Sequence, residues 1–493
     1  EAVSKASFYW HDYETWGSNP QWDRPAQFAG QRTDSALNPI GDPLVLYAKP
    51  TPDFLPHPDA CLLTGITPQQ AFEEGVEESE FIARIHQEMY QPGTCSLGYN
   101  SLRFDDTVTR FTLHRNLRDP YGREYGQGRS RWDLIDAVRT AYALRPEGIN
   151  WPKRSDGLPS FRLEDLARVN GLEQDYAHDA LSDVQATIAL ANLLKEKQPR
   201  LFEWLFAQRG KAAALKGLRL GSSTPILHVS GMFGAAQANL GVVVPIGKHE
   251  TNSNEVLMVD LRVPPASWLE LPESEIKSRL YTPSESLPAD FVRPGIKSVH
   301  LNRCPVLLPF KMLTEEVAQR ACLDRAEIEE NAKYLQQYES RHPGAISDKL
   351  RKVVHYESDG ASDDVDVSLY SGGFLSESDR STLDSLLRLD PTAMLRASPV
   401  FEDRRLDTMW FRFRARNYPD SLSSSERESW LQFCAGRIEN GVKGAENAPL
   451  GASEFKALID VRRRELGMDD QKARLLGALE DWLNRLTSPE IGA

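Results

Sequence analysis

The sequence has few cysteines and no motif among them. Its five cysteines lie far apart, and none belongs to a CxxC pair. An odd, scattered set excludes a disulfide framework and argues against a zinc module. Such a set is typical of a reducing compartment, so we expect a cytoplasmic protein.

Long hydrophobic runs are also missing. No apolar stretch approaches the length of a membrane span, and the N-terminus shows no signal-peptide pattern. We therefore expect no membrane partner. The 493 residues are 40% hydrophobic and 26% charged, without a low-complexity tract or an internal repeat. Such a chain is expected to form about two to four globular domains.

An excess of positive charge is missing as well. The net charge of -13 does not suggest a nucleic-acid partner, so any such surface must be a local patch. Residues 103–145, however, hold nine arginines, no lysine and six acids, with Tyr121, Tyr125 and Trp132 between them. Arginines neutralise phosphates, and aromatic rings stack on unpaired bases. This stretch is either a track for a single strand or a solvated arginine-rich loop.

Residues 8–17 (FYWHDYETWG) contain the first chemical signal. The aromatic run that ends in Thr and Gly predicts a strand at the point where it leaves a sheet. Asp12 and Glu14 lie two residues apart and therefore share one face of that strand. Two adjacent carboxylates repel each other unless a cation joins them. The pair predicts a divalent-metal site; the alternative is a solvated strand edge.

Two later stretches extend this cluster. Asp105 follows a predicted buried strand at residues 95–99, and Asp183 follows His178 by five residues in a predicted helix that reaches about residue 197. Three converging elements that carry carboxylates would bind two divalent ions about 3.5–4 Å apart. Oxygen ligands favour Mg²⁺ or Mn²⁺ over zinc. A histidine can take a proton from water at neutral pH, although His178 alone could be a surface loop residue.

The rest of the N-terminal part alternates strands with helices, which predicts an α/β domain. We expect strands at residues 26–33 and 44–48 that pair with the first strand, and helices from Thr67 and at residues 80–90. A capping box at residues 130–133 predicts a helix to residue 144. A further helix is expected to be capped by Ser160 and ended by Gly171.

A second zone begins near residue 201 and a third near residue 357. Short strands at residues 226–229, 241–245, 256–261 and 297–301 predict a small β barrel or sheet, followed by a helix that Asp324 caps. Residues 357–364 are polar and acidic, as in a linker. Helices are expected at residues 376–389, 425–438, 453–466 and 471–486. Residues 410–416 alternate like a half-buried element whose arginines either face a groove or pair with nearby acids.

Three of these patterns together resemble the motifs of the DEDDh exonuclease superfamily: Asp12-x-Glu14, Asn100 to Asp105, and His178-x4-Asp183. The stretches 98–100, 131–134, 144–152, 157–163, 228–234 and 414–417 resemble the bacterial exodeoxyribonuclease I family over nearly the whole chain. The resemblance implies an α/β RNase H-like exonuclease domain at residues 1–198, an SH3-like β domain at 199–356 and an all-α C-terminal domain at 357–493.

The resemblance also implies an activity. The family degrades single-stranded DNA processively in the 3′→5′ direction to deoxyribonucleoside 5′-monophosphates, in DNA repair and recombination, and we expect a monomer. One alternative is a catalytically inactive exonuclease fold that serves as a single-strand-binding scaffold. Another is a different DEDDh enzyme, such as an oligoribonuclease or a proofreading subunit, but those chains are much shorter.

Roles for individual residues follow from the same resemblance. Two Mg²⁺ ions, with Mn²⁺ as a substitute, would be held by Asp12, Glu14 and Asp183, with Asp105 completing the second site directly or through water. His178 would be the general base. The implied DNA contacts are Glu14 and Arg162 at the terminal nucleotide, and Arg110, Tyr121, Tyr125 and Arg139 along the strand. The implied site for the C-terminal tail of single-stranded-DNA-binding protein contains Arg145 and Trp204.

Overall fold

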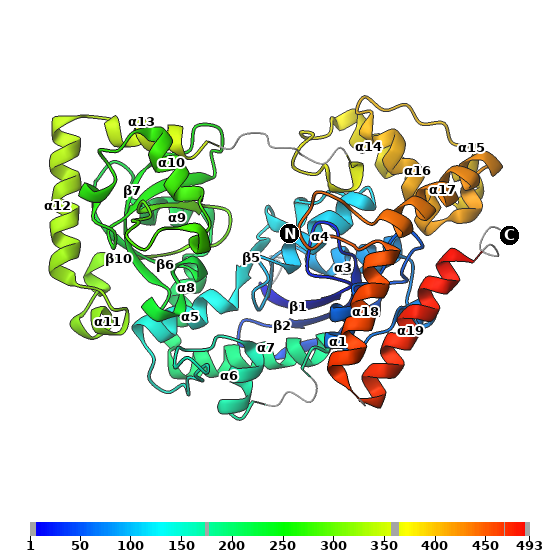
Figure 1. The fold of residues 1–493 in the computed structure, drawn as a ribbon, viewed down its shortest axis with the longest axis horizontal. Coiled ribbons are helices and arrows are strands. Elements are labelled where there is room, and N and C mark those ends of the chain that lie inside the picture. Colours follow the sequence, from blue (N-terminus) through cyan, green and yellow to red (C-terminus); the bar gives the residue numbers. More distant parts are fainter. Residues whose placement is uncertain (1–5, 173–176, 356–363, 468, 489–493) are drawn as a thin grey trace. The chain divides into compact units, whose positions relative to one another are not determined.

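The computed structural model describes residues 6–172, 177–355, 364–467 and 469–488. The chain forms two compact units, and Figure 1 draws their helices and strands with most of them labelled. The first unit comprises residues 1–130, 175–185 and 360–493, and the second comprises residues 131–174 and 186–359. Except for Asp364, the predicted linker at residues 357–364 lies outside the described residues.

A five-stranded sheet contains the predicted first strand. Its order is β3-β2-β1-β4-β5, and its strands are β1 (Ser7–Thr15), β2 (Pro25–Thr33), β3 (Pro39–Tyr47), β4 (Thr94–Gly98) and β5 (Ser130–Asp133). β1 pairs antiparallel with β2 and parallel with β4. The expected pairing of residues 44–48 with the first strand is wrong, because both edges of β1 are occupied and β3 pairs with β2.

The register between β1 and β4 leaves the end of β1 unpaired on that side. The paired residues run from Ser7 opposite Thr94 to Trp10 opposite Leu97. Asp12 and Glu14 therefore lie beyond the end of β4, where the chain turns toward the next helix. Gly98 permits this close approach, since a Cβ there would lie 2.5 Å from the carbonyl oxygen of His11.

The N-terminal part of the first unit also contains the helices α1 (Pro58–Thr64), α2 (Pro68–Glu74), α3 (Glu78–Met89) and α4 (Asp105–Arg115). The predicted helix start at Thr67 is confirmed, because its hydroxyl accepts a hydrogen bond from the backbone N–H of Gln70. Phe28 of β2 packs with Phe81 of α3 and Val108 of α4 in one buried cluster. This cluster fixes α4 against the sheet.

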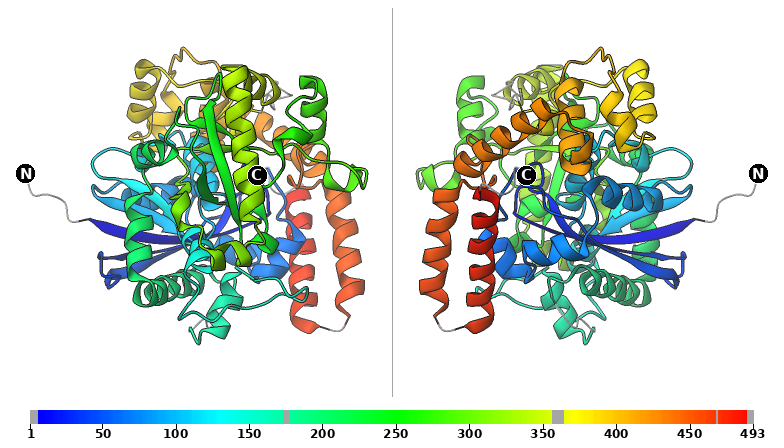
Figure 2. Two further views of the ribbon diagram at one scale, coloured as in Figure 1. Left: turned by 90° about the vertical axis from the view of Figure 1, so that its left-hand side faces the viewer. Right: turned by 90° about the vertical axis from the view of Figure 1, so that its right-hand side faces the viewer.

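The C-terminal helices belong to the same unit. They are α14 (Glu377–Leu386), α15 (Pro391–Arg396), α16 (Arg405–Asn417), α17 (Ser424–Asn440), α18 (Ala452–Leu466) and α19 (Asp470–Thr487), as the sequence predicted for four of the six. Figure 2 shows α18 and α19 side by side. Phe455 and Leu479 from this pair share a buried cluster with Trp16 and Leu55. The C-terminal helices thus complete the core of the N-terminal part.

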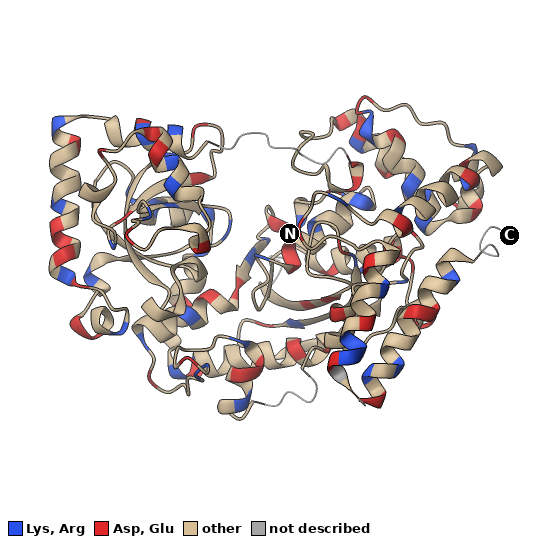
Figure 3. Cartoon of the chain, in the orientation of Figure 1, with Lys and Arg blue, Asp and Glu red and all other residues tan. Residues whose placement is uncertain are grey.

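Charges of both signs are interspersed along α18 and α19 (Figure 3). One exposed ion pair, between Arg463 and Glu480 at 2.8 Å, joins the two helices. None of the helices within the described ranges combines the length and the apolar character that a membrane span requires.

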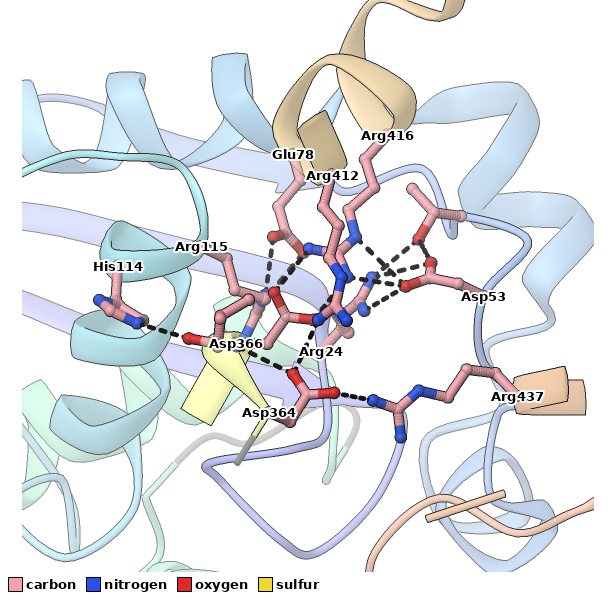
Figure 4. A network of polar contacts seen from close by, with 12 residues as sticks. Arg24, Asp53, Glu78, His114, Arg115, Asp364, Asp366, Arg412, Arg416 and Arg437 are labelled. Atoms are coloured by element: carbon pink, nitrogen blue, oxygen red, sulfur yellow. Dashed lines mark hydrogen bonds and ion pairs between the residues drawn. The ribbon is translucent and has the colours of Figure 1, made fainter. Parts of the chain in front are cut away.

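A buried ion-pair network joins α16 to the loops of the N-terminal part (Figure 4). Arg416 lies 2.6 Å from Asp366 and 2.9 Å from Asp53, measured between guanidinium nitrogen and carboxylate oxygen. Arg412 pairs with Asp364 at 2.8 Å. Of the two alternatives for these arginines, pairing with acids is confirmed. The half-buried element that was predicted at residues 410–416 is part of the helix α16.

Asp53 is held ionised by this network. Burial alone would raise its pKa, but Arg24 and Arg416 hold the pKa of Asp53 well below its usual range. Arg24 lies 2.7 Å from the same carboxylate. A chain segment of the N-terminal part is therefore fixed to α16 by charge as well as by apolar packing.

The second unit contains another five-stranded sheet, ordered β10-β6-β7-β8-β9. Its strands are β6 (Ile226–Val229), β7 (Leu240–Lys248), β8 (Glu255–Asp260), β9 (Ile296–His300) and β10 (Val306–Pro309), of which the sequence did not predict the last. Its other elements are α5 (Leu134–Leu144), α6 (Leu163–Val169), α7 (Ala180–Lys197, from residue 186), α8 (Pro199–Ala207), α9 (Lys211–Leu218), α10 (Glu273–Tyr281), α11 (Glu315–Arg320), α12 (Arg325–Arg341) and α13 (Ala345–Val353).

Two predicted helix starts in this unit are wrong. Residues 130–133 form β5, and the N-cap of α5 is Asp133, whose side chain accepts a hydrogen bond from the N–H of Ile135. α6 begins at Leu163, and Ser160 does not cap it. The Ser160 hydroxyl instead donates a hydrogen bond to the Asp165 carboxylate at 2.7 Å. α6 also ends before Gly171. The predicted cap of α12 at Asp324 is confirmed.

Candidate active site

Three carboxylates meet at the end of β1. One oxygen atom each from Asp12, Glu14 and Asp183 lies within 4.8 Å of the other two. β1 supplies the first two from one face, and the first turn of α7 supplies the third. Glu14 is buried, at 8% exposure, whereas Asp12 and Asp183 are half-buried.

The electrostatics of this group favour a cation. Burial, and then the charge of Asp105, raise the pKa of Asp12 well above its usual range. Burial raises the pKa of Glu14 to about 9, and nearby carboxylates, Asp183 first, act in the same direction. The charges that contribute most to these two shifts are negative. Bringing these carboxylates together thus costs free energy that a bound cation would recover.

Asp105 lies beside the group of three but is not a member of it. It begins α4, is 4% exposed, and accepts a hydrogen bond through Oδ1 from the backbone N–H of Tyr13 at 3.0 Å. Tyr13 stands between Asp12 and Glu14 in the sequence, so Asp105 is tied to the backbone that carries both. Burial, and then the charge of Asp106, raise the pKa of Asp105 to about 8.

His178 precedes α7 by two residues. Its backbone adopts a left-handed conformation, with φ of 64°, and its side chain is half-buried. Asp179 follows it and accepts a hydrogen bond from the N–H of Ser182 at 3.1 Å, which starts the helix that carries Asp183. The negative charge of Asp179 also acts on Asp12. The sequence position of Asp179, next to His178, gives no sign of this effect on Asp12.

The residues present suit divalent ions. Carboxylate oxygens are the ligands that Mg²⁺ and Mn²⁺ prefer, and oxygens from three carboxylates converge here. Asp105 is near enough to influence the same charge balance. The acidic group therefore fits the divalent-metal site that the sequence predicted.

An exposed aromatic surface lies elsewhere in the first unit. Tyr125 is 63% exposed, and the Tyr121 ring packs edge-on against Phe374 at 6.1 Å between centroids. Phe374 is 91% exposed, and the Tyr370 hydroxyl accepts a hydrogen bond from Arg110 Nη1 at 3.1 Å. The sequence did not predict roles for Tyr370 and Phe374, which follow the acidic segment and come near Tyr121 only through folding. A cavity of about 310 Å³ opens beside them.

The arginines of residues 103–145 are less available than the sequence suggested. Arg115 and Arg123 are buried and paired with Glu78 and Asp106, so they stabilise the fold. Arg110 is paired with Glu124 at 2.8 Å and its guanidinium lies 5.2 Å from the centre of the Tyr121 ring. The stretch is therefore neither a continuous row of free cations nor a solvated loop.

The remaining predicted contacts lie in the second unit. Arg139 is paired with Asp136 at 3.2 Å, and Arg162 is exposed and lies 2.5 Å from Glu164. Arg145 is exposed at the end of α5, and Trp204 is half-buried on α8, which packs against α5. Among the described residues no hydrogen bond or ion pair joins these last two, and their role stays a prediction.

Three family models match consecutive parts of the chain. A model described as Exonuclease matches residues 9–191, one described as Exonuclease I SH3-like domain matches residues 209–356, and one described as Exonuclease I C-terminal domain matches residues 363–486. The chain belongs to the exodeoxyribonuclease I family. It is a nuclease, and the predicted order of an α/β exonuclease domain, an SH3-like β domain and an all-α domain is confirmed.

Curated relatives agree with this family. Exodeoxyribonuclease I of Escherichia coli (strain K12) is 45% identical over 88% of this chain and 90% of its own length. Exodeoxyribonuclease I of Haemophilus influenzae is 43% identical over 89% of this chain and 92% of its own length.

Solved structures of family members match 98% of this chain and all of theirs. E. coli Exonuclease I in complex with a dA16 oligonucleotide has a TM-score of 0.92 at 41% identity. A zinc-bound form of an E. coli ExoI–single-stranded-DNA complex has a TM-score of 0.91 at 40% identity. A structure of SSB/Exonuclease I in complex with the inhibitor CFAM has a TM-score of 0.88 at 39% identity.

Proposed function

We propose that this protein degrades single-stranded DNA processively from its 3′ end to deoxyribonucleoside 5′-monophosphates, and that it acts in DNA repair and recombination. The observation that carries the proposal is the convergence of Asp12, Glu14 and Asp183 at the end of β1, in a chain of this family. The relatives named for exodeoxyribonuclease activity support it. The catalytically inactive alternative has no support, because Asp105 acts on the same group and His178 is present two residues before α7.

In the proposed site, Asp12, Glu14 and Asp183 hold two Mg²⁺ ions, and Asp105 completes the second position directly or through water. When bound, such ions neutralise charge on the scissile phosphate and make water a better nucleophile at neutral pH. The acidic group and the zinc-bound family member support a divalent ion, and the choice of Mg²⁺ follows from the all-oxygen ligands.

His178 takes the proton of the attacking water as its oxygen forms a bond to phosphorus. The bond between phosphorus and the O3′ of the preceding nucleotide breaks, so the terminal nucleotide leaves with a 5′-phosphate and the strand keeps a 3′-hydroxyl. Arg162, together with Glu14, orients the terminal nucleotide. The roles of these residues rest on the family resemblance.

The proposed single strand stacks on the aromatic surface of the first unit, formed by Tyr121, Tyr125, Tyr370 and Phe374. Aromatic stacking tolerates any base, which suits an enzyme that must pass every sequence. Arg110 and Arg139 contribute charge along the track. The proposed protein partner is the C-terminal tail of single-stranded-DNA-binding protein, at Arg145 and Trp204, and the structure with SSB of a family member supports that choice.

The domain boundaries at residues 198 and 356, the monomeric state and the cytoplasmic location remain part of the proposal. One assay tests its core. Single strands labelled at the 3′ or the 5′ end are incubated with Mg²⁺ or with EDTA. Immediate release of the 3′ label as a mononucleotide, with Mg²⁺ only, is expected. Earlier release of the 5′ label, or cleavage in EDTA, would contradict the proposal.

A further inference from the structure

Two ion pairs of reciprocal charge join α4 to the short turn Gly122–Glu124. Asp106 and Arg110 lie four residues apart on α4 and therefore share a face. Arg123 Nη2 lies 2.9 Å from Asp106 Oδ1, and Arg110 Nη2 lies 2.8 Å from Glu124 Oε1. The helix thus offers an acid and then a base, and the turn offers a base and then an acid. We call these four residues the double clamp.

The two pairs differ in burial. The Arg123 side chain is 0% exposed and that of Asp106 is 3% exposed, whereas Arg110 is 12% exposed. The Nε and Nη1 atoms of Arg123 have no hydrogen-bond partner within the part of the chain that the structure describes. Nη2 therefore makes the close polar contact of this guanidinium. Loss of one partner from such a buried pair is strongly destabilising, and the fold must relieve it by moving.

The buried pair lies next to the metal site in the chain. Asp106 directly follows Asp105, and both belong to the first turn of α4. Asp105 in turn accepts the hydrogen bond from Tyr13 N, the backbone amide between Asp12 and Glu14. A movement of Asp106 is therefore passed on to Asp105 over a single peptide unit.

The outer pair lies next to the aromatic surface. Tyr121 and Tyr125 flank the turn on both sides, and the Arg110 guanidinium lies over the Tyr121 ring and is hydrogen-bonded to Tyr370. Glu124 fixes Arg110 with two hydrogen bonds of 2.9 Å each. Glu124 thereby holds together the group of side chains on which the single strand is proposed to stack.

We propose that the double clamp positions two parts of the proposed site at once. The Arg123–Asp106 pair holds the first turn of α4 so that Asp105 faces the metal-binding carboxylates. The Arg110–Glu124 pair holds the aromatic surface. Arg123 and Glu124 are positioning residues that touch neither metal nor reacting atoms. This inference rests on the proposed exonuclease function and deepens it.

The test compares Arg123→Met with Glu124→Ala. Mn²⁺ binding is measured by calorimetry on protein stripped with EDTA, and single-strand binding is measured by fluorescence anisotropy in EDTA. Arg123→Met should need about 10–100-fold more Mn²⁺ for half-saturation, as is usual when a residue behind a metal ligand is lost, with unchanged strand affinity. Glu124→Ala should weaken strand binding and leave Mn²⁺ binding unchanged.

A matched control separates positioning from loss of stability. Arg115 is also buried on α4, and it pairs with Glu78 at 3.2 Å, but at the far end of the helix. Arg115→Met should lower the melting temperature as Arg123→Met does, without changing the Mn²⁺ requirement. Arg123→Lys, which keeps the charge, should restore most of the Mn²⁺ affinity.

The outcomes distinguish the inference from the function on which it rests. If Arg123→Met fails to fold, the double variant Arg123→Gln with Asp106→Asn replaces it, since it offers a neutral hydrogen-bonding pair. Equal Mn²⁺ requirements in the Arg115 and Arg123 variants would overturn the inference, and so would a strand-binding loss in both clamp variants alike. If the two clamp variants differ as expected but the wild-type protein shows no 3′→5′ cleavage, the proposed function alone is overturned.

Discussion

His178 and Asp183 lie five residues apart at the start of α7, yet the proposed reaction gives them different tasks. His178→Ala should lower turnover by about 10²–10⁴-fold, the usual contribution of a general base, while Mn²⁺ binding stays as in the wild type. Asp183→Ala should lose both turnover and Mn²⁺ binding, because Asp183 belongs to the group of three carboxylates. Single-turnover rates and calorimetric Mn²⁺ titrations measure the two effects. Normal turnover in His178→Ala would leave this histidine a purely structural role.

The raised carboxylate pKa values make a second prediction at the scale of single residues. Burial and neighbouring charge raise the pKa of Glu14 to about 9 and that of Asp105 to about 8, against about 4 in an unfolded chain. Between these limits the folded state keeps protons that the unfolded state gives up. The free energy of unfolding of the metal-free protein should therefore fall as pH rises from about 5.5 to about 9.

Calorimetric melting temperatures in EDTA and in Mg²⁺ test this. Mg²⁺ should restore stability most at high pH, because it binds only the folded, ionised group. Asp105→Asn should flatten the pH dependence in EDTA, whereas Asp42→Asn, an exposed control on β3, should not. A melting temperature that rises with pH in EDTA would show that the carboxylates are stabilised by something other than a bound cation.

At the scale of elements, the turn between Tyr121 and Tyr125 is the part most open to test. Tyr125→Ala or Phe374→Ala should each weaken single-strand binding by about 1–3 kcal/mol with an unchanged salt dependence, because stacking releases no counterions. Tyr281, an exposed tyrosine on α10, provides a matched control whose alanine variant should bind normally. Salt titrations in EDTA measure both quantities. A reduced salt slope in Tyr125→Ala would indicate that the loop holds phosphates instead.

The elements also show why part of the site could be predicted from the sequence. The prediction of Asp12 and Glu14 rests on the alternation of side chains along a strand, and that of Asp183 rests on a helix start. Both are local patterns. Phe374 and Asp366 gave no such signal, because Phe374 meets Tyr121 from a distant part of the chain and Asp366 pairs with Arg416, 50 residues later. The role of Arg416 could not be predicted for the same reason. A sequence of alternating aromatic and basic residues is the same whether the arginines face solvent or pair with buried aspartates.

Local patterns also fail where two elements compete for the same residues. Residues 130–133 satisfy a capping box, yet they form β5, and the cap moves three residues on to Asp133. β10 escaped prediction because a four-residue strand ending in proline has too little periodicity. The order of the three family domains was predictable because each has its own composition, whereas the packing of α18 and α19 onto Trp16 was not.

For the whole molecule, this packing implies that the N-terminal part and the C-terminal helices form one folding unit although they differ in family domain. Trp16 and Leu55 share a buried cluster with Phe455 and Leu479, and Arg416 is paired to Asp53 across the same boundary. A metal bound at Asp12 should therefore stabilise the C-terminal helices as well. The second unit has its own core and should not respond.

Arg416→Met tests this coupling. It leaves Asp53 and Asp366 short of a buried partner, a change that typically costs about 3–5 kcal/mol, so it should lower the melting transition that Mg²⁺ raises. Leu335→Ala, in the buried part of α12, should lower a transition that Mg²⁺ leaves in place. Scanning calorimetry with and without Mg²⁺ separates the two. If Arg416→Met lowers the melting temperature only of a transition that Mg²⁺ does not shift, the C-terminal helices unfold by themselves. The shared core would then not couple them to the active site.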